Sequence, residues 1–270
     1  MILSISPSSI GVNFISLRLM KRLLIVFSTA LACCLSSFAQ SLEDVKSVAG
    51  AEGQIIRHEN YTVSYNPQTK QSNWVSWSIS KEELASAVSR KDYSFAPDPK
   101  VKIAPVTSMD YSRSGWDRGH MCPAADNKYS ATAMAESFYM TNICPQNHTL
   151  NEKTWNYLET ACRNWAQSGV VYVVCGPLFN GKPKTHIGNA RVAVPDAFWK
   201  VVLRFYKGSW KGVGFVMPNS EVSDDISQYA CSINDVERLT GFDFFSTLDD
   251  SYEESVESVY DKSFWPHSRH

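Results

Sequence analysis

An amphipathic segment that runs directly into an apolar one sets the architecture of this chain. Residues 151–168 place large apolar side chains at helical spacing, and Gly169 stands where such a helix would end. Residues 170–174 form a continuous apolar run, which is typical of a strand covered on both faces. The pattern therefore predicts helices packed against a sheet. The helical stripe consists of Trp155, Leu158, Cys162 and Trp165.

Further segments support an α+β fold with a mixed or antiparallel central sheet flanked by helices. Residues 61–65 and 73–79 read as a β-hairpin around a turn at 66–71, and residues 197–206 and 212–217 as two more strands. Ser80 with Glu83 forms a capping-box pattern that opens a predicted helix at 81–90. Pro97 and Pro99 prevent this helix from continuing into the following segment. Ser232 with Asp235 caps a second short helix that Gly241 closes, and residues 242–245 supply apolar anchors.

The length of 270 residues fits one large domain with processed ends. Residues 1–39 read as a signal peptide with an upstream extension, in which Met20 is an alternative start and Lys21-Arg22 precedes an apolar run. We therefore expect a secreted or periplasmic protein without stable membrane insertion; a membrane anchor or a lipoprotein at Cys33 is the weaker alternative. The expected division is a short segment at 40–55, the main domain at 56–250 and a tail at 251–270.

Charge and cysteine content narrow the function. Without residues 1–39 the chain keeps 23 basic and 27 acidic residues, a formal charge of −4, which argues against a passive DNA coat but allows a local cationic groove. Five cysteines then remain, an odd number, and none forms a CxxC pair. Cys122 and Cys144 each precede a proline and flank the segment with most chemistry, so a disulfide between them is the pairing we expect.

Two segments concentrate reactive side chains. The first contains Asp117-Arg118-Gly119-His120, which combines an anion binder, a position free of a Cβ and a side chain that exchanges protons near neutral pH. The second runs from residue 139 to residue 159 and includes Asn142, Asn151 and Glu159. On an ideal helix Asn151 and Glu159 lie about 12 Å apart along the axis, with an offset of about 80°, and so face the same side.

These two boxes, their order and their spacing resemble the DNA/RNA non-specific endonucleases of the ββα-metal (His-Me finger) fold, a family that includes secreted bacterial nucleases and mitochondrial endonuclease G. The resemblance covers residues 61–245. It implies hydrolysis of phosphodiester bonds in DNA and RNA without sequence preference, giving 5′-phosphate ends. It also implies His120 as the base that activates water and Asn151 as the protein ligand of a divalent cation, Mg²⁺ by expectation, with Mn²⁺ or another divalent ion as the alternative.

Other roles follow from the same resemblance. Arg118 is expected to bind the scissile phosphate, Glu159 to accept hydrogen bonds from cation-bound water, and Asn142 to fix the loop or the orientation of His120. Alternatives are an ion pair of Arg118 with Asp117 or Glu136, and a purely solvated Glu159. Trp155 is expected in the core, and an inward His148 would join the cation site. Further phosphate-binding candidates are Arg57, Arg90, Arg113 and Arg191.

Two other classes of function compete with a nuclease. A catalytically inactive module that binds nucleic acid or glycan would use the eight Trp and twelve Tyr residues as stacking surfaces, but would not require His120, Arg118 and Asn151 together. A thiol enzyme would use Cys122 or Cys144 with His120 or His148, although no oxyanion-hole signature accompanies them. Oligomeric state stays open, a homodimer included.

Overall fold

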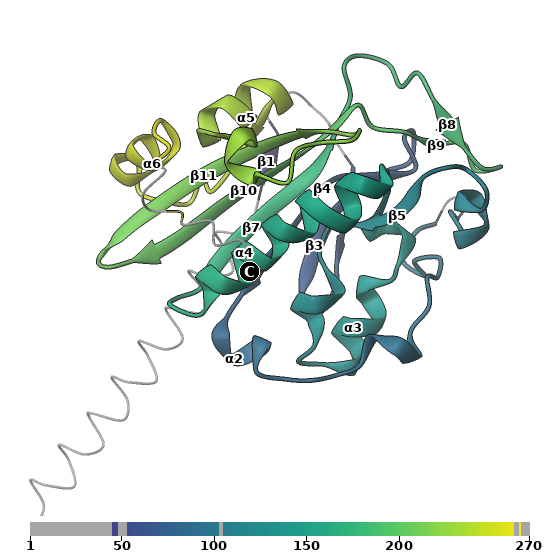
Figure 1. The fold of residues 1–270 in the computed structure, drawn as a ribbon, viewed down its shortest axis with the longest axis horizontal. Coiled ribbons are helices and arrows are strands. Elements are labelled where there is room, and N and C mark those ends of the chain that lie inside the picture. Colours follow the sequence, from purple (N-terminus) through teal and green to yellow (C-terminus); the bar gives the residue numbers. More distant parts are fainter. Residues whose placement is uncertain (1–44, 48–52, 103–104, 262–264, 266–270) are drawn as a thin grey trace, which may run out of the picture. The chain divides into compact units, whose positions relative to one another are not determined.

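The centre of the protein is a seven-stranded antiparallel sheet (Figure 1). The structure, a computed structural model, describes residues 45–47, 53–102, 105–261 and 265. The predicted α+β class with an antiparallel sheet is confirmed. From one edge to the other the strands are β12 (Ala230–Cys231), β11 (Ser209–Pro218), β10 (Ala197–Tyr206), β7 (Val171–Leu178), β4 (Gln71–Ile79), β3 (Tyr61–Asn66) and β2 (Gln54–Arg57).

The strands follow the sequence pattern closely. The β3–β4 hairpin pairs Tyr61 with Trp77 and turns through the predicted polar segment. Strand β7 is buried along nearly its whole length, as its continuous apolar run predicts, because strands β4 and β10 flank it and helices cover the sheet. The predicted strands at 197–206 and 212–217 are β10 and the greater part of β11, which pair along ten residues each.

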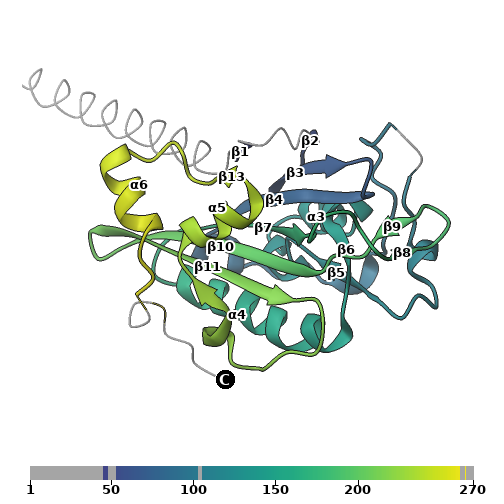
Figure 2. The same ribbon diagram turned by 90° about the horizontal axis from the view of Figure 1, so that it is seen from above.

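Helices cover both faces of this sheet (Figure 2). Helix α4 (Asn156–Ala166) packs on β4 and β7, whereas α5 (Ile233–Thr240) and α6 (Asp250–Glu257) pack on β11. Helix α5 has the predicted capping box at Ser232 and ends at Gly241, whose φ of 71° is left-handed. Phe242, Phe244 and Phe245 are buried, which confirms the predicted apolar anchors.

Two helix predictions need correction. The predicted helix at 151–168 begins instead as a π-helical turn, Leu150–Trp155, and becomes α-helical only at Asn156. The predicted helix at 81–90 has its capping box at Ser80 but is only α2 (Lys81–Leu84). It ends early because the Val88 amide donates to the Lys128 carbonyl (3.0 Å) and Ser89 caps a separate 3₁₀ turn.

A second, two-stranded sheet carries the Asp-Arg-Gly-His segment. Strand β5 (Asp117–His120) pairs with β6 (Ile143–Gln146), and the chain then enters the π-turn and α4, which gives the ββα order. Short elements complete the described chain: β1 (Lys46–Ser47) with β13 (Phe242–Asp243), β8 (His186–Ile187) with β9 (Val192–Ala193), α3 (Ala131–Ser137), and 3₁₀ turns at Arg90–Asp92, Ser108–Tyr111, Ala124–Asn127, Met140–Asn142 and Ile226–Tyr229.

The expected disulfide is absent. Cys122 and Cys144 are both free and buried; the Cys122 thiol receives a hydrogen bond from Asn127 and the Cys144 thiol contacts Ser72. The prediction was wrong because it used sequence position alone, which does not determine how two side chains face each other. The signal peptide expected at 1–39 lies outside the described residues. Within the described chain no helix is long and apolar enough to cross a membrane.

Candidate functional site

His120 ends strand β5, and its neighbour explains the glycine in the segment. A Cβ on Gly119 would lie 2.7 Å from the Cβ of Gln146 and 2.8 Å from its Cδ. Gln146 belongs to the paired strand β6 and is fully buried. Gly119 is therefore required for space, so that β5 can lie against β6 and place His120 at the strand end.

The imidazole of His120 lies between aromatic rings. Phe95 is 5.4 Å from it between ring centroids, and Phe138 is 5.2 Å away in an edge-on arrangement. Its backbone carbonyl accepts a hydrogen bond from the Trp155 indole (3.3 Å), and its Nε2 atom is buried without a hydrogen bond from any described residue. Burial, assisted by the positive charge of Arg90, lowers the pKa of His120 to about 3, so the ring is neutral at physiological pH.

Asn151 lies in the first turn of the π-helical segment, facing β5. Its Nδ2 donates to Asp117 Oδ2 (3.0 Å), which fixes the amide and turns its oxygen away from that contact. The same carboxylate oxygen contacts His148 Nδ1 (2.9 Å). His148 itself is 65% exposed and also contacts Glu152 (3.3 Å), and the bond to Asp117 raises its pKa. The imidazole thus pairs with acids at the surface.

Four of the five predicted site residues line one pocket of about 510 Å³. His120 and Arg118 come from β5, Asn151 from the π-turn and Glu159 from α4. The fifth, Asn142, does not line it. The remaining lining residues are Arg90, Phe95, Pro123, Ala124, Ala125, Glu152, Asn156 and Arg163.

Three arginines give the pocket its positive charge. Arg118 lies over the Phe95 ring at 5.0 Å, and no described acid pairs with it, so neither expected ion pair forms. Arg90 lies over the Phe138 ring at 5.6 Å. Arg163 bonds to the buried Asp126 through Nη1 (3.0 Å). Of the four arginine candidates considered from sequence only Arg90 reaches the pocket, and Arg163 was missed.

Arg163 was detectable in the sequence. It stands four residues after Glu159, so both side chains lie on the same helical face. Glu159 lines the pocket, and its burial raises the pKa of the carboxyl group to about 7, opposed by the charges of Lys200 and Arg163. This position at the pocket wall and its partial burial disfavour the alternative of a purely solvated helix acid.

Asn142 lies buried behind the pocket and ties three segments together. Its Oδ1 accepts the amide of Cys122, two residues after His120, at 2.8 Å. Its Nδ2 donates to the carbonyls of Cys122 and Ser137 at 2.8 Å each. Ser137 ends the helix that precedes Phe138, so Asn142 joins the strand of His120 to the aromatic ring beside it.

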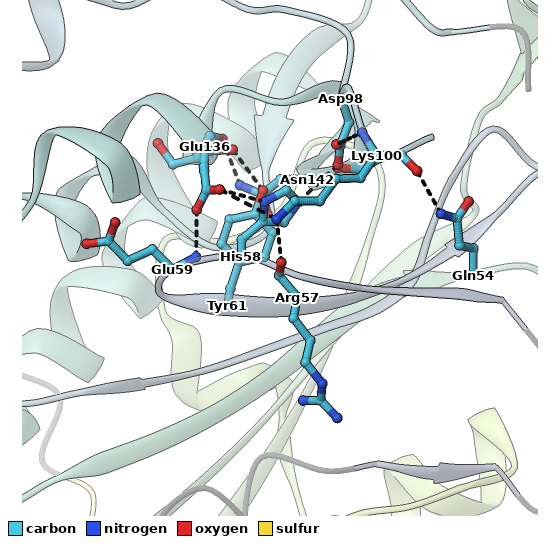
Figure 3. Close-up of polar contacts among 11 residues, drawn as sticks. Gln54, Arg57, His58, Glu59, Tyr61, Asp98, Lys100, Glu136 and Asn142 are labelled. Atoms are coloured by element: carbon cyan, nitrogen blue, oxygen red, sulfur yellow. Dashed lines mark hydrogen bonds and ion pairs between the residues drawn. The ribbon is translucent and has the colours of Figure 1, made fainter. Parts of the chain in front are cut away.

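A cluster of polar contacts joins His58, Asp98 and Glu136 (Figure 3). His58 has no exposed side-chain surface; its Nε2 contacts Asp98 Oδ2 (3.0 Å) and its Nδ1 lies 3.2 Å from Glu136 Oε1. Thr141 donates to the same Asp98 oxygen (2.7 Å). Asp98 follows Phe95 by three residues, so the cluster anchors the loop that presses Phe95 onto His120.

The cysteines do not provide a nucleophile. Burial raises the pKa of both Cys122 and Cys144 above the usual value for a thiol. Neither residue lines the pocket. The thiolate needed for attack is therefore suppressed, which disfavours the thiol-enzyme hypothesis. Trp155 is 1% exposed and lies in the core as expected.

Comparison with known proteins identifies relatives of this chain. The family model for DNA/RNA non-specific endonucleases matches residues 40–251. The chain is 39% identical over 206 residues to the mitochondrial nuclease EXOG of Xenopus laevis, which covers 70% of this chain and 58% of that protein. It is 35% identical over 209 residues to human mitochondrial endonuclease G, covering 72% of this chain and 70% of that protein. The chain thus spans less than two thirds of the EXOG relative.

A solved structure agrees with these sequence matches. A chain in the crystal structure of an EndoG/EndoGI complex, solved to explain EndoG inhibition, aligns with a TM-score of 0.69 and 30% identity, covering 74% of this chain and 89% of that one. The relatives correct one expectation: the secreted or periplasmic location is contradicted, because the EXOG and endonuclease G relatives are mitochondrial nucleases. By the family match, the sequence identity and the shared fold, the chain belongs to the DNA/RNA non-specific endonuclease family.

Proposed function

We propose that this protein is a divalent-cation-dependent endonuclease that hydrolyses phosphodiester bonds in DNA and RNA without sequence preference. The observation that carries the proposal is the convergence of His120, Arg118, Asn151 and Glu159 on one pocket, from strand β5, the π-turn and helix α4 of a ββα unit. Family membership supports the reaction class, and the three pocket arginines suit a polyanionic substrate.

His120 acts as the general base. Because its pKa lies near 3, the imidazole is neutral at physiological pH and can accept a proton from water. Its imidazole lines the pocket, and the Trp155 indole holds its backbone carbonyl through a hydrogen bond. The activated water attacks phosphorus in line with the departing 3′ oxygen, which leaves a 5′-phosphate on the product.

Arg118 binds the phosphate and stabilises the charge that builds up on it. The Phe95 ring supports the guanidinium from one side, which orients its planar donors without neutralising them. Arg90 and Arg163 line the same pocket and bind the flanking phosphates or the same one. Contacts of this kind read the backbone rather than the base edges, so they give little sequence preference, and attack by water makes the sugar's 2′-OH unnecessary.

The donor set fits a hard divalent cation. Asn151 offers an amide oxygen whose orientation is fixed by the bond from its Nδ2 to Asp117, and Glu159 offers carboxylate oxygens on the same pocket wall. Mg²⁺ prefers such oxygen donors, keeps several waters and takes the rest of its shell from substrate phosphates. When bound, the cation supplies charge that stabilises the leaving oxygen. Asn151 would hold it, and Glu159 would orient water beside it.

The test is cleavage of supercoiled plasmid and of RNA by the full chain. We expect both substrates to be cut with Mg²⁺ and neither with EDTA, and we expect His120→Ala and Asn151→Ala to lower the rate at least about a hundredfold. His186→Ala is the matched control, because His186 lies on β8 and does not line the pocket.

Two results would contradict the proposal. Folded protein that binds nucleic acid but cuts neither substrate with any divalent ion would favour the binding-module hypothesis. Cleavage that persists in EDTA would refute the need for a cation, and cleavage that persists in His120→Ala would refute the assignment of His120 as the base. Replacing Mg²⁺ by Mn²⁺ in the same assay determines the preferred ion.

A further inference from the structure

A second group of cations lies outside the pocket, on two segments that adjoin strand β5. Residues 105–116 and 179–195, which we call the cationic lobe, contain four basic side chains and a single acid. The cations are Arg113, Lys182, Lys184 and Arg191, and none of them lines the pocket. Among the described residues only Lys184 of these four has an ion pair, with Asp196 (3.9 Å). The other three are exposed, so their charges are available to an anion.

The one acid of the cationic lobe binds the lobe's own backbone. Asp110 Oδ1 accepts the amide of Ala190 in the turn of the β8–β9 hairpin (2.9 Å). A Cβ on Gly188, in the same turn, would stand 2.4 Å from the Cβ of Asp110. Arg191 follows Ala190 directly, and Arg113 follows Asp110 by three residues. The two arginines therefore come from turns that are packed against each other.

Both arginines have a left-handed backbone. The φ angle is 56° at Arg113 and 58° at Arg191. A Cβ makes this conformation unfavourable, and glycine or asparagine adopts it with less strain. The geometry of the turns therefore does not explain why arginine stands at both positions.

The cationic lobe is fixed to the strand that pairs with β5. Tyr111 donates its hydroxyl hydrogen to the carbonyl of Ile143 in β6 (3.2 Å). Asn219 donates through Nδ2 to the carbonyls of Pro195 (2.9 Å) and Pro145 (3.1 Å), which joins the end of the lobe to β6. The position of the lobe relative to the β5–β6 sheet is thus held from two sides.

Arg113 is also close to the pocket along the chain. Arg118 stands five positions after Arg113, so their Cα atoms are at most about 17 Å apart. Each strand of duplex DNA has a phosphate about every 3.4 Å along the axis. A polynucleotide whose scissile phosphate lies at Arg118 therefore has further phosphates within reach of Arg113, about five nucleotides away at most.

The negative charge of the protein is concentrated elsewhere. Residues 232–261 contain nine acidic residues and one basic residue, Arg238. They include α5 and α6, which pack on β11. The cationic lobe instead adjoins the turn before β4, where the Ala193 amide donates to the Thr69 carbonyl (3.0 Å), and β10 and β7 lie between β4 and β11. A polyanion is therefore attracted to the lobe and repelled from the side of α5 and α6.

We propose that the cationic lobe is an exosite for the substrate, in which Arg113 and Arg191 bind phosphates of the nucleic-acid backbone several nucleotides away from the bond that is cut. This rests on the proposed function. Contacts with backbone phosphates add affinity for long polynucleotides without adding sequence preference. Because they are made equally before and during the reaction, they lower KM and leave kcat unchanged.

The test removes these charges and keeps the backbone conformation. The variants are Arg113→Asn, Arg191→Asn and the double variant, because asparagine tolerates the left-handed region. Lys207→Asn is the matched control, since Lys207 is an exposed cation with a φ of 49° in the turn between β10 and β11. The ten residues of β10, about 33 Å of strand, separate this turn from the end of the lobe.

Binding is measured by fluorescence anisotropy with a labelled DNA duplex of about 30 base pairs, in EDTA, from about 50 to 200 mM salt. This measurement does not depend on cleavage. Plasmid cleavage with Mg²⁺ is measured separately. Wild-type protein that binds the duplex but does not cut would contradict the proposed function, and the binding data would still decide whether the lobe contacts phosphates.

Each phosphate contact contributes about 0.9 to the slope of log K against log salt, so each single variant should lose about 0.9 and the double variant about 1.8. We expect Kd of the double variant to rise about tenfold or more at about 0.1 M salt, and Lys207→Asn to change it by less than about twofold. In plasmid cleavage the double variant should raise KM about tenfold, with kcat within about twofold of wild type.

Other outcomes would overturn the inference. They are a salt slope of the double variant within about 0.3 of wild type, equal losses in Lys207→Asn, or a fall in kcat at unchanged KM. Arg113→Lys/Arg191→Lys retains both charges, so an equal loss of slope there would also refute the phosphate contacts. If the asparagine variants do not fold, glycine at both positions removes the charges and relieves the left-handed backbone, and the same loss of slope is expected.

Discussion

Replacing Gly119 by alanine tests how the Asp-Arg-Gly-His strand is packed. The added methyl would stand 2.7 Å from the Cβ of Gln146, well inside van der Waals contact, and this atom cannot rotate away because it belongs to the paired strand. Overpacking of this kind costs about 1–3 kcal/mol. We therefore expect Gly119→Ala to lower the free energy of unfolding by about 2 kcal/mol and Tm by about 4–8 °C.

The same substitution should reduce activity more than stability. His120 follows Gly119 directly, and a shift of about 1 Å in a reacting group costs up to about a hundredfold in rate. The assay is urea unfolding together with plasmid cleavage for Gly119→Ala, Gln146→Gly and the double variant, because only glycine removes the Cβ of residue 146. The Gln146 side-chain amide has no hydrogen bond from the described residues, so removing this side chain breaks no printed hydrogen bond.

The double variant decides between a local clash and a general loss of strand structure. If the clash is with Gln146, the double variant should recover at least about 1 kcal/mol relative to the sum of the two single variants. A Gly119→Ala protein as stable and as active as wild type would refute the packing argument. So would strictly additive losses, since they would mean that the methyl group and Gln146 do not meet.

Three further predictions concern ionisation and cysteine chemistry. Burial raises the pKa of Glu159 from 4.5 to about 7, so the stability that comes from its protonated form is fully present below pH 4.5 and is lost as pH rises through 7. In the cation-free protein, Glu159→Gln should remove up to about 3 kcal/mol of this pH-dependent fall in the free energy of unfolding. Identical curves of unfolding free energy against pH for the two proteins would contradict the prediction. His58→Asn removes the contact of His58 Nε2 with the buried Asp98 and should lower the free energy of unfolding, measured in urea, by about 1–3 kcal/mol; an unchanged free energy of unfolding would contradict this prediction. Because Cys122 and Cys144 are free and buried, a reducing agent should leave Tm unchanged and a thiol reagent should modify them only after unfolding; a reduction-sensitive Tm would instead indicate a disulfide.

The elements that were predicted correctly from the sequence are those whose local pattern of apolar, capping and turn residues matches their environment in the folded protein. The hairpin, the buried strand β7 and the capped helix α5 each have a period, a cap or a turn that the tertiary structure does not oppose. Helix α2 is shorter than predicted because a distant carbonyl, that of Lys128, takes the amide of Val88. No local pattern reports such a partner.

The site was predictable to the extent that its residues are sequence neighbours. His120 and Arg118 share one strand, and Asn151 and Glu159 share one helical segment, so their spacing alone brought each pair together. Phe95 and Lys200 reach the same region from distant elements, and their contacts with Arg118 and Trp155 exist only after the sheet has formed. Burial likewise sets the pKa of His120, which sequence position could not indicate.

The π-helical turn also limits how this chain can vary in length. A π-turn holds one residue more than the α-helical turn it replaces, and deleting that residue from Leu150–Trp155 would restore a regular helix without breaking its hydrogen bonds. The fold would survive and the flanking segments would keep their phase, because an α-helical turn completes the same rotation with one residue fewer, but the side chains inside the turn would take new angular positions. Asn151 would then leave the wall it shares with Glu159. Gain or loss of a single residue in this turn would leave a chain that folds but whose pocket residues no longer converge. Insertions and deletions that preserve the site therefore have to fall in loops outside the π-turn.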